Sequence, residues 1–365
     1  MLERSASEDQ IARLRLIRSD NIGPVTYFQL LARFGSAGAA LDAIPDLAAR
    51  GGGRAPKLVA RGVVEREMEA VAALGARYLF LGQGLYPPLL AELETAPPAL
   101  IVKGHLSLLE KPAIAMVGAR NASAAACRFA RQLARQVGEA GAVIVSGLAR
   151  GIDTAAHDGA LESGTIAIIA GGIDVAYPPE NADRQQAITE RGLLIAEQPP
   201  GVDPRARHFP YRNRIIAGLA HGTVVIEAAP KSGSLITARY ATEFGRDVMA
   251  VPGSPLDPRA QGCNQLIREG AILVQNADDV METISPFKLR PLAQKRLDYA
   301  APAVADASEA ERSAVLDLLS PTPVPVDEVL RQSGLAPAAV QTVLLELELA
   351  ARLERHAGGR VSLIG

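Results

Sequence analysis

Between residues 113 and 277, short aliphatic runs alternate with segments of helical periodicity. These runs are apolar at nearly every position rather than at alternate ones, which is typical of parallel strands buried on both faces. With helices between them, they predict a doubly wound, mostly parallel α/β sheet within a domain at 76–285. The runs lie at 113–118, 142–147, 165–172, 193–198, 223–228, 247–253 and 271–276.

The first part of the chain, residues 5–75, has a helical pattern. An apolar face begins at Ile11, breaks at 21–24 (NIGP), and resumes at Tyr27. The break is either a plain connection between two helices or a hairpin whose backbone amides grip a phosphate. Residues 51–56 (GGGRAP) predict a loop. We therefore expect a small helical domain.

The last part of the chain predicts a further domain after a linker. Residues 286–308 are rich in proline and alanine without clear periodicity, so we expect a mobile linker. Residues 309–365 then show three helical segments, the second ending at Gly334 and the third starting near Pro337, followed by two strands around 358–359. Three helices and a β-hairpin predict a winged helix.

Composition narrows the class of protein. The chain has 365 residues, 48% hydrophobic and 21% charged, as in ordinary globular proteins of two or three domains. It has no apolar run near the ~20 residues of a membrane helix and no signal-peptide pattern, so we expect a cytoplasmic protein without a membrane span. Cys127 and Cys263 cannot build a disulfide framework, and we expect reduced, buried thiols and no metal site.

Charge and aromatic content restrict any nucleic-acid site to a local surface. Lysine plus arginine number 38 against 40 acidic residues, a net charge of −2, which leaves no global electrostatic footprint for a polyanion. Aromatic residues make up only 4% of the chain and tryptophan is absent, so no extended base-stacking platform is evident.

The loops after the predicted strands carry a candidate anion site. In an open parallel sheet, ligands bind outside the carboxyl ends of the strands, where loops and helix N-termini converge. Six of these loops contain glycine and three carry a cation, which favours phosphate binding, although glycine and proline also serve tight turns with no ligand. The loop residues concerned are Gly118, Arg120, Ser146, Gly147, Arg150, Lys231, Ser232 and Gly233.

The segment 203–214 adds four arginines against one acidic residue, with Phe209 and Tyr211 between them. Guanidinium groups beside aromatic rings suit a sugar-phosphate backbone with splayed bases. Alone, the segment is equally consistent with a solvated basic turn. Combined with the glycine loops, it indicates single-stranded nucleic acid rather than a small nucleotide.

Common enzyme signatures are missing from the sequence. There is no GxGxxG, no Gly-Lys pair of a Walker A loop, no GxSxG and no HExxH. Asp153 and His157 stand four residues apart and are a candidate acid/base pair on one helix face. The alternative is that Asp153 caps the helix and His157 packs locally, and we favour it.

At these residues the sequence resembles the DNA-processing protein A family, also called DprA or Smf. The resemblance implies an extended Rossmann-like sheet, flanked by an N-terminal domain of SAM or helix-hairpin-helix type and a C-terminal winged helix. The matching stretches are MVGAR (116–120), VSGLARGIDTAAHDGAL (145–161), AGGIDVAYPPEN (170–181), AEQPPG (196–201), HFPYRNRIIAGLA (208–220), KSGSLITARYA (231–241) and VPGSPLDPRAQGCNQLIREGA (251–271).

The resemblance implies a non-enzymatic function without cofactor, metal or catalytic residues. Such proteins act in natural transformation and recombination: they bind single-stranded DNA without strong sequence preference, form homodimers through the central domain and help the RecA recombinase to load. Carried over by motif, the DNA-binding residues are Arg120 and the Arg212, Asn213 and Arg214 of FPYRNR. Their expected neighbours are Gly118, Ser146, Gly147, Arg150, Phe209, Lys231, Ser232 and Gly233.

The alternative function is that of a lysine-decarboxylase-like nucleotide phosphoribohydrolase. The site of those enzymes resembles PGGxGTxxE with a catalytic glutamate. The corresponding loop here is APKSGSLITARYA, with Thr237 and Ala238 where the acid is expected, so the general base is missing.

Two further expectations concern partners. Residues 309–365 hold five arginines, no lysine and eight acidic residues, whereas DNA-groove readers are normally basic, so we expect the winged helix to contact protein or the central domain. The apolar positions Leu266, Ile267, Ile272, Val280 and Ile284 belong either to a dimer surface or to the core of the central domain.

Overall fold

The computed structural model describes residues 7–288, 306–356 and 358–364. Its contacts group the chain into two compact units, one within Met1–Met68 and Leu297–Gly365, the other within Glu69–Arg296. Residues 289–305 of the expected linker lie outside the described residues, so its mobility remains a prediction.

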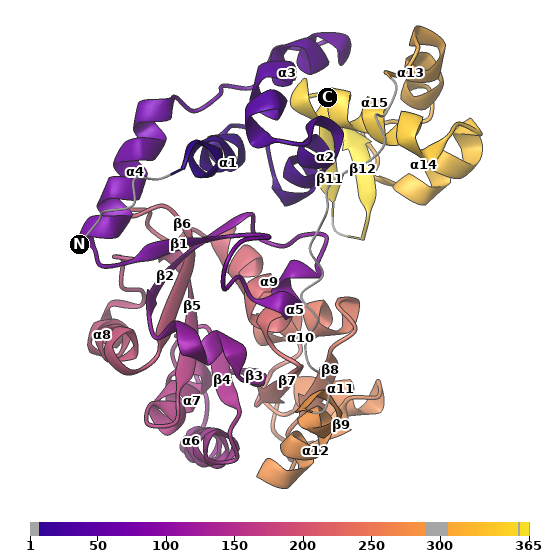
Figure 1. Ribbon diagram of the computed structural model, residues 1–365. Helices are drawn as coiled ribbons and strands as arrows, with labels where there is room; N and C mark the ends of the chain where they lie inside the picture. The colour runs from indigo at the N-terminus through magenta and orange to yellow at the C-terminus, as the bar shows by residue number, and fades with distance from the viewer. Residues whose placement is uncertain (1–6, 289–305, 357, 365) are drawn as a thin grey trace. The chain divides into compact units, whose positions relative to one another are not determined.

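A nine-stranded sheet forms the centre of the second unit, with the strand order β1-β2-β6-β5-β4-β3-β7-β8-β9 (Figure 1). All seven strands expected from the aliphatic runs are present and mutually parallel, which confirms the doubly wound α/β class. They are β3 (Ala113–Gly118), β4 (Val143–Ser146), β5 (Thr165–Gly172), β6 (Leu193–Gln198), β7 (Gly222–Ile226), β8 (Asp247–Ala250) and β9 (Ile272–Leu273).

Two strands were not expected. β1 (Arg77–Phe80) and β2 (Ala99–Gly104) extend the sheet beyond β6, and β2 runs antiparallel to both β1 and β6. β1 is only four residues long, and only its last two residues are buried. β2 begins with a buried apolar run at 99–102 that follows the turn signal Pro97-Pro98 and was not expected as a strand. The sheet is therefore mixed at this edge.

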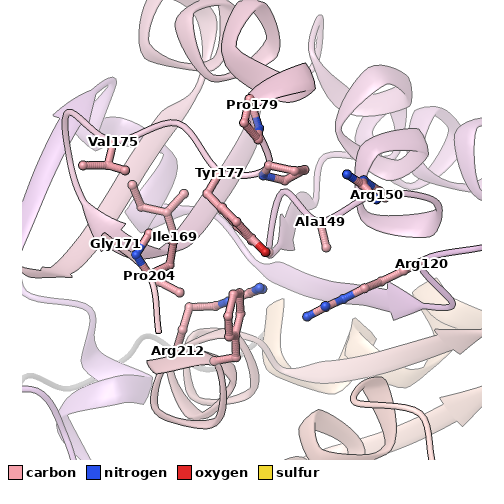
Figure 2. Close-up of a pocket in the computed structure, with 14 residues that line it drawn as sticks. Arg120, Ala149, Arg150, Ile169, Gly171, Val175, Tyr177, Pro179, Pro204 and Arg212 are labelled. Atoms are coloured by element: carbon pink, nitrogen blue, oxygen red, sulfur yellow. The ribbon is translucent and has the colours of Figure 1, made fainter. Parts of the chain in front are cut away.

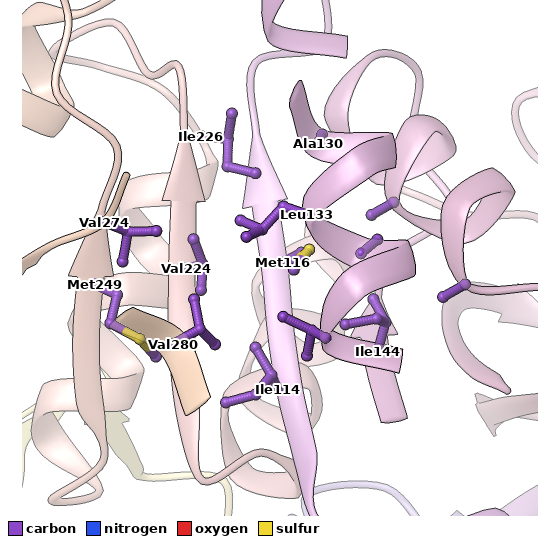
Figure 3. Packing of buried hydrophobic residues seen from close by; sticks show 14 of the residues in the cluster. Ile114, Met116, Ala130, Leu133, Ile144, Val224, Ile226, Met249, Val274 and Val280 are labelled. Atoms are coloured by element: carbon purple, nitrogen blue, oxygen red, sulfur yellow. The ribbon is translucent and has the colours of Figure 1, made fainter. Parts of the chain in front are cut away.

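Helices cover both faces of the sheet. α6 (Ala124–Glu139), α7 (Ile152–Ala160), α8 (Ala182–Arg191) and α12 (Ala277–Lys288) pack on one face, and α9 (His208–Leu219) and α10 (Ser234–Glu243) pack on the other. In Figure 3, Ile114 and Met116 of β3 lie against Ala130 and Leu133 of α6 in the larger core. Shorter helices are α5 (Pro88–Ala91), α11 (Gln261–Arg268) and the 3₁₀ segments Leu106–Glu110 and Pro179–Asn181.

The direction of the chain changes at β3. From β3 it moves through β4, β5 and β6 toward one edge, then crosses to β7 on the other side of β3. α6 after β3 and α10 after β7 consequently lie on opposite faces. In open α/β sheets such a switch point leaves a crevice at the carboxyl ends of the two adjacent strands.

The other unit contains the helical domain and the winged helix. Near the N-terminus lie α1 (Glu8–Arg18), α2 (Pro24–Phe34) and α3 (Ala37–Arg50), while α4 (Arg61–Ala73) spans the boundary between the units. Gly23 precedes α2 and Pro24 occupies its first position, as the NIGP break suggested. The winged helix has α13 (Glu309–Leu316), β10 (Val324–Pro325), α14 (Val326–Ser333), α15 (Pro337–Leu349), β11 (Leu353–His356) and β12 (Arg360–Leu363).

The cysteines form no disulfide. Cys263 is buried, as expected, whereas Cys127 is only half-buried against the core. Burial raises the pKa of the Cys263 thiol to about 11, so it is protonated at neutral pH. No group of three metal-ligating side chains occurs among the described residues. No helix in the described ranges has the length and apolar character needed to cross a membrane.

Candidate nucleic-acid interface

Two cavities adjoin at the carboxyl edge of the sheet. The smaller, of about 130 Å³, lies among the loops after β4 and β5 and the start of α9. The larger, of about 540 Å³, lies at the switch point between the loops that follow β3 and β7. Arg120, Ala149, Phe209 and Arg212 line both, so the two cavities form one continuous site.

Most residues expected at the site line these cavities. The exceptions are Ser146 and Arg214. The ten that line one or both are Gly118, Arg120, Gly147, Arg150, Phe209, Arg212, Asn213, Lys231, Ser232 and Gly233.

Ser146 and Arg214 make internal contacts instead. The Ser146 hydroxyl is fully buried and donates a hydrogen bond to the Met116 carbonyl at 2.6 Å, which ties β4 to β3. The Arg214 guanidinium pairs with the Glu197 carboxylate at 2.5 Å and also donates to the Thr95 carbonyl. Both residues therefore support the fold around the site, and neither lines the cavities.

The Phe209 ring lines both cavities and is surrounded by two arginines and a second aromatic ring. The guanidinium carbons of Arg120 and Arg212 lie 5.2 and 6.0 Å from its centroid, within the range of cation–π contacts. The Tyr177 ring lies 5.8 Å from it at a tilt of 53°, and Tyr177 is 47% exposed. Figure 2 shows Tyr177, Arg120 and Arg212 pointing toward one another across the smaller cavity.

A buried ion pair organises the loop after β4. The Asp153 carboxylate accepts hydrogen bonds from the backbone amides of Gly147 and Ala149 at 3.1 and 3.3 Å, and the Arg212 guanidinium lies 3.8 Å from it. Burial raises the pKa of Asp153, against the opposing effects of Arg212 and the two amides. Burial also lowers the pKa of Arg212 to about 10, so Arg212 remains charged at neutral pH.

Gly147 makes this arrangement possible. A Cβ atom there would lie 1.2 Å from an Arg212 guanidinium nitrogen, so any other residue would displace the Arg212 side chain from this position. The Arg212 Nε has no hydrogen-bond partner among the described residues, while the same side chain lines both cavities. Arg212 is thus a buried side chain that contributes a positive charge to the lining of both cavities.

Some of the other basic side chains that line the cavities form ion pairs with carboxylates, and others do not. Arg150 pairs with Glu180, and Arg259 pairs with Glu227 at 3.2 Å and Asp257 at 2.9 Å. Arg120 and Lys231 are exposed and form no ion pair within the described part of the chain. These two charges are the ones most available to an anion in the larger cavity.

The structure favours packing over acid–base chemistry for His157. Its Nδ1 lies 2.7 Å from the Thr165 hydroxyl, and the ring is 1% exposed. Burial lowers the pKa of His157 to about 3, so the ring is neutral at physiological pH. The expectation that Asp153 caps the helix is wrong. The N-cap of α7 is Gly151, with no side-chain cap bond, and Asp153 is the second helical residue, whose carboxylate accepts from the Gly147 and Ala149 amides of the preceding loop.

Sequence reasoning missed Tyr177 and Arg259. Tyr177 belongs to the stretch AGGIDVAYPPEN and Arg259 to VPGSPLDPRAQGC, which carry the family resemblance but were not expected to reach the site. Each lies several residues after the end of its strand, in a longer loop that returns to the cavity. Both could have been identified from the sequence by listing the aromatic and basic residues of every long loop that follows a predicted parallel strand.

Family models match most of the chain. The model for DNA recombination-mediator protein A matches residues 77–285. The model for the DprA-like N-terminal HHH domain matches residues 7–70, and that for the DprA winged helix domain matches residues 300–359.

Two curated relatives show the extent of similarity. DNA processing protein DprA of Streptococcus pneumoniae is 49% identical over 198 residues, which are 54% of this chain and 70% of that protein. Protein Smf of Escherichia coli is 39% identical over 283 residues, which are 76% of this chain and 75% of that protein.

Solved structures agree with these matches. DNA processing protein A from Streptococcus pneumoniae aligns with a TM-score of 0.64 at 37% identity, covering 76% of this chain and 98% of that chain. DNA processing protein A from Helicobacter pylori, described for its single-stranded DNA binding mode, aligns with a TM-score of 0.53 at 28% identity, covering 58% and 96%. Because the recombination-mediator model matches more than half of the chain, and relatives and structures agree with it, this chain belongs to the DNA recombination-mediator protein A (DprA) family.

Proposed function

We propose that the two adjoining cavities bind single-stranded DNA without strong sequence preference. The observation that carries the proposal is the juxtaposition of the exposed cations Arg120 and Lys231, unpaired among the described residues, with the aromatic pair Phe209 and Tyr177. The Helicobacter pylori relative, described for binding single-stranded DNA, supports the same class of ligand.

The larger cavity suits the phosphates. Lys231, Ser232 and Gly233 lie on the loop that leads into α10, opposite Arg120 on the loop after β3. The two loops together offer cations, a hydroxyl and backbone amides, the groups that contact phosphate oxygens. None of these groups reads a base edge, so we expect binding to depend little on sequence.

The smaller cavity suits a base. Ile169, Val175, Pro204 and the rings of Tyr177 and Phe209 give it an apolar and aromatic lining. Single strands can stack their bases on such rings, whereas the bases of a duplex are already stacked on one another. The site should therefore prefer single strands to duplexes.

Fluorescence anisotropy with a labelled ~40-mer tests the proposal. We expect single strands to bind at least tenfold more tightly than the matched duplex. Four to six phosphate contacts give a slope of log K against log salt of roughly −3 to −4. Equal affinity for both forms, or no binding, would contradict the proposal; nucleotide hydrolysis assays on the same sample then test the phosphoribohydrolase alternative.

Phe209→Leu tests the stacking part of the site. Leucine retains apolar volume but removes the ring that both arginines contact. We expect a roughly 5- to 150-fold loss of affinity for a single strand, since stacking on one ring contributes about 1–3 kcal/mol. Tyr211→Leu is the control, because Tyr211 is 55% exposed and lines neither cavity. Equal losses in the two variants would remove Phe209 from the site.

We also propose that the chain dimerises through the β9 edge of the central domain. Val280 and Ile284 are fully buried in the intradomain core, whereas Ile272 and Leu273 are 40% and 43% exposed on the last strand of the sheet. An edge strand with exposed apolar side chains can pair with a second copy. Two linked sites would raise the effective concentration of the second contact to about the millimolar range.

The double variant Ile272→Asp/Leu273→Asp tests this dimer. We expect sedimentation to show a monomer at micromolar concentrations where the unmodified chain is dimeric, because two buried carboxylates would face each partner. Affinity for a 40-mer should fall more than affinity for a 6-mer. Leu85→Asp, at a side chain 43% exposed elsewhere, is the matched control. A monomeric unmodified chain would refute the proposal.

Loading of RecA completes the proposed role in transformation and recombination. The family description as a recombination mediator supports it. The test is RecA filament formation on a single strand coated with single-strand-binding protein. We expect the chain to accelerate it, and an unchanged rate would contradict this part of the proposal.

A further inference from the structure

The third helix of the winged helix, α15, is buried on two sides. Winged helices of the helix-turn-helix class read DNA by laying this helix in the major groove. Here Val340, Val343, Leu344 and Leu347 face the core of the winged helix itself. Leu345 and Leu349 instead belong to the core of the N-terminal helices, with 3% and 0% exposure. The side of α15 that a groove would need is therefore occupied by protein.

The loop at Gly51–Gly53 receives the end of α15. A Cβ atom at Gly51 would lie 2.2 Å from the Glu346 carbonyl oxygen, and one at Gly53 would lie 2.3 Å from the Ala350 carbonyl oxygen. Any larger residue would collide with backbone rather than with a movable side chain. The Arg352 guanidinium closes the contact by donating to the Gly51 carbonyl at 3.0 Å. The glycines thus allow the loop backbone to pack directly against the end of this helix, and we call the Gly51–Gly53 loop its seat.

Polar contacts surround the apolar centre of this interface. The Gln29 side-chain amide donates to Gln341 at 2.9 Å, and Arg33 donates to the Thr342 hydroxyl at 3.2 Å. Asp306 pairs with Arg33 and, at 2.6 Å, with Arg50. An apolar core with a hydrogen-bonded polar rim is the anatomy of a specific protein interface. In Figure 1, α15 lies beside α2 and α3.

The two carboxylates of α15, Glu346 and Glu348, form ion pairs with arginines of the winged helix. Glu346 is 1% exposed and receives two hydrogen bonds from the Arg312 guanidinium, at 2.8 and 3.0 Å. Glu348 pairs with Arg355 at 2.8 Å. α15 itself carries no arginine or lysine. Its chemistry matches a protein partner and lacks the cations with which a helix contacts DNA phosphates.

We propose that α15 is a docking helix for the N-terminal helical domain of the same chain, with the Gly51–Gly53 loop as its seat, and that it does not read duplex DNA. The two ends of the chain then form one cooperative unit. A DNA duplex could reach α15 only if this interface opened.

Hydrogen exchange on the full chain tests the proposal. The variant Gly51→Ala/Gly53→Ala adds two methyl groups against the carbonyls of α15. We expect amides of α3 and α15 to exchange at least tenfold faster than in the unmodified chain, and those of β3–β7 to remain unchanged. Gly38→Ala is the control, because Gly38 lies in α3 and a Cβ there meets no atom within 4 Å. The control should exchange as the unmodified chain does.

A second variant keeps the test decisive if the alanines unfold the N-terminal helices. Arg33→Glu reverses the charge that faces Asp306 and should also accelerate exchange in α15. Protection in the unmodified chain should not depend on protein concentration, since the partner is the same chain. Unchanged exchange of α15 in both variants, or protection that disappears on dilution, would overturn the proposal. So would tight duplex binding that Leu345→Ala or substitutions on α15 abolish.

Discussion

Arg120→Glu should weaken binding of a single strand about 100-fold, which corresponds to roughly 2.7 kcal/mol. Arg120 lines both cavities, is exposed and has no carboxylate partner among the described residues, so its charge is free for a phosphate. Glutamate removes that cation and adds repulsion close to the buried Asp153. The salt slope should become shallower by about 0.7 for each phosphate that Arg120 neutralises. Anisotropy titration at two salt concentrations measures both effects.

Arg135→Glu is the charge-matched control for this change. Arg135 lies on α6 with its side chain 65% exposed, pairs loosely with Glu139 at 3.9 Å and lines neither cavity. The two variants have the same net charge. If Arg135→Glu reduced affinity as strongly as Arg120→Glu, binding would depend on overall charge and not on the proposed site.

Asp153→Ala should lower the free energy of unfolding of the central domain by about 3–5 kcal/mol. The substitution leaves the buried Arg212 without its counter-charge and removes the acceptor of the Gly147 and Ala149 amides. Asp153 and Arg212 are only 5% and 7% exposed, so an unpaired charge and two unbonded amides are costly at this position. Urea denaturation followed by circular dichroism measures the loss.

Two companion variants isolate the cause of that loss. Asp158→Ala, also on α7, breaks the more exposed pairs with Arg184 and Arg131 and should cost under about 1 kcal/mol. Adding Arg212→Met to Asp153→Ala should recover at least about 1 kcal/mol, because no unpaired charge remains buried. A double variant less stable than Asp153→Ala would show that the ion pair is not what Asp153 supplies.

The parallel part of the sheet was predictable because a strand buried on both faces is apolar at nearly every position. Ile166 to Ala170 in β5 are all buried, so the sequence alone marks them as a strand. β1 was not predictable in this way, since Arg77 is exposed and only Leu79 and Phe80 are buried. The antiparallel edge depends on pairing with β6 across about 90 residues, which no local pattern encodes.

The candidate site was partly predictable for a similar reason. Loops after parallel strands meet at one edge, so glycines and cations such as Arg120 and Lys231 could be brought together from the sequence. The direction of each side chain could not. Arg212 and Arg214 are two residues apart on α9, about 200° around the helix, so one lines the cavities and the other pairs with Glu197.

The contact between the two ends of the chain was not predictable at all. The sequence marks Gly51–Gly53 as a loop, and the acidic character of residues 309–365 argues against a DNA reader. Neither feature names the partner, because the interface joins residues about 300 positions apart. The structure shows that Gly51 and Gly53 allow close approach to the backbone at the end of α15.

Cross-linking tests the central claim most directly. A single strand carrying photoreactive 5-iodouracil would be irradiated with the full chain, and the linked peptides identified by mass spectrometry. We expect links to Phe209 or Tyr177 and to the loops after β3 and β7, reduced by excess unlabelled single strand and by Arg120→Glu. Links confined to residues 8–70 or 309–364, unaffected by Arg120→Glu, would contradict the claim that the carboxyl edge of the sheet holds the DNA.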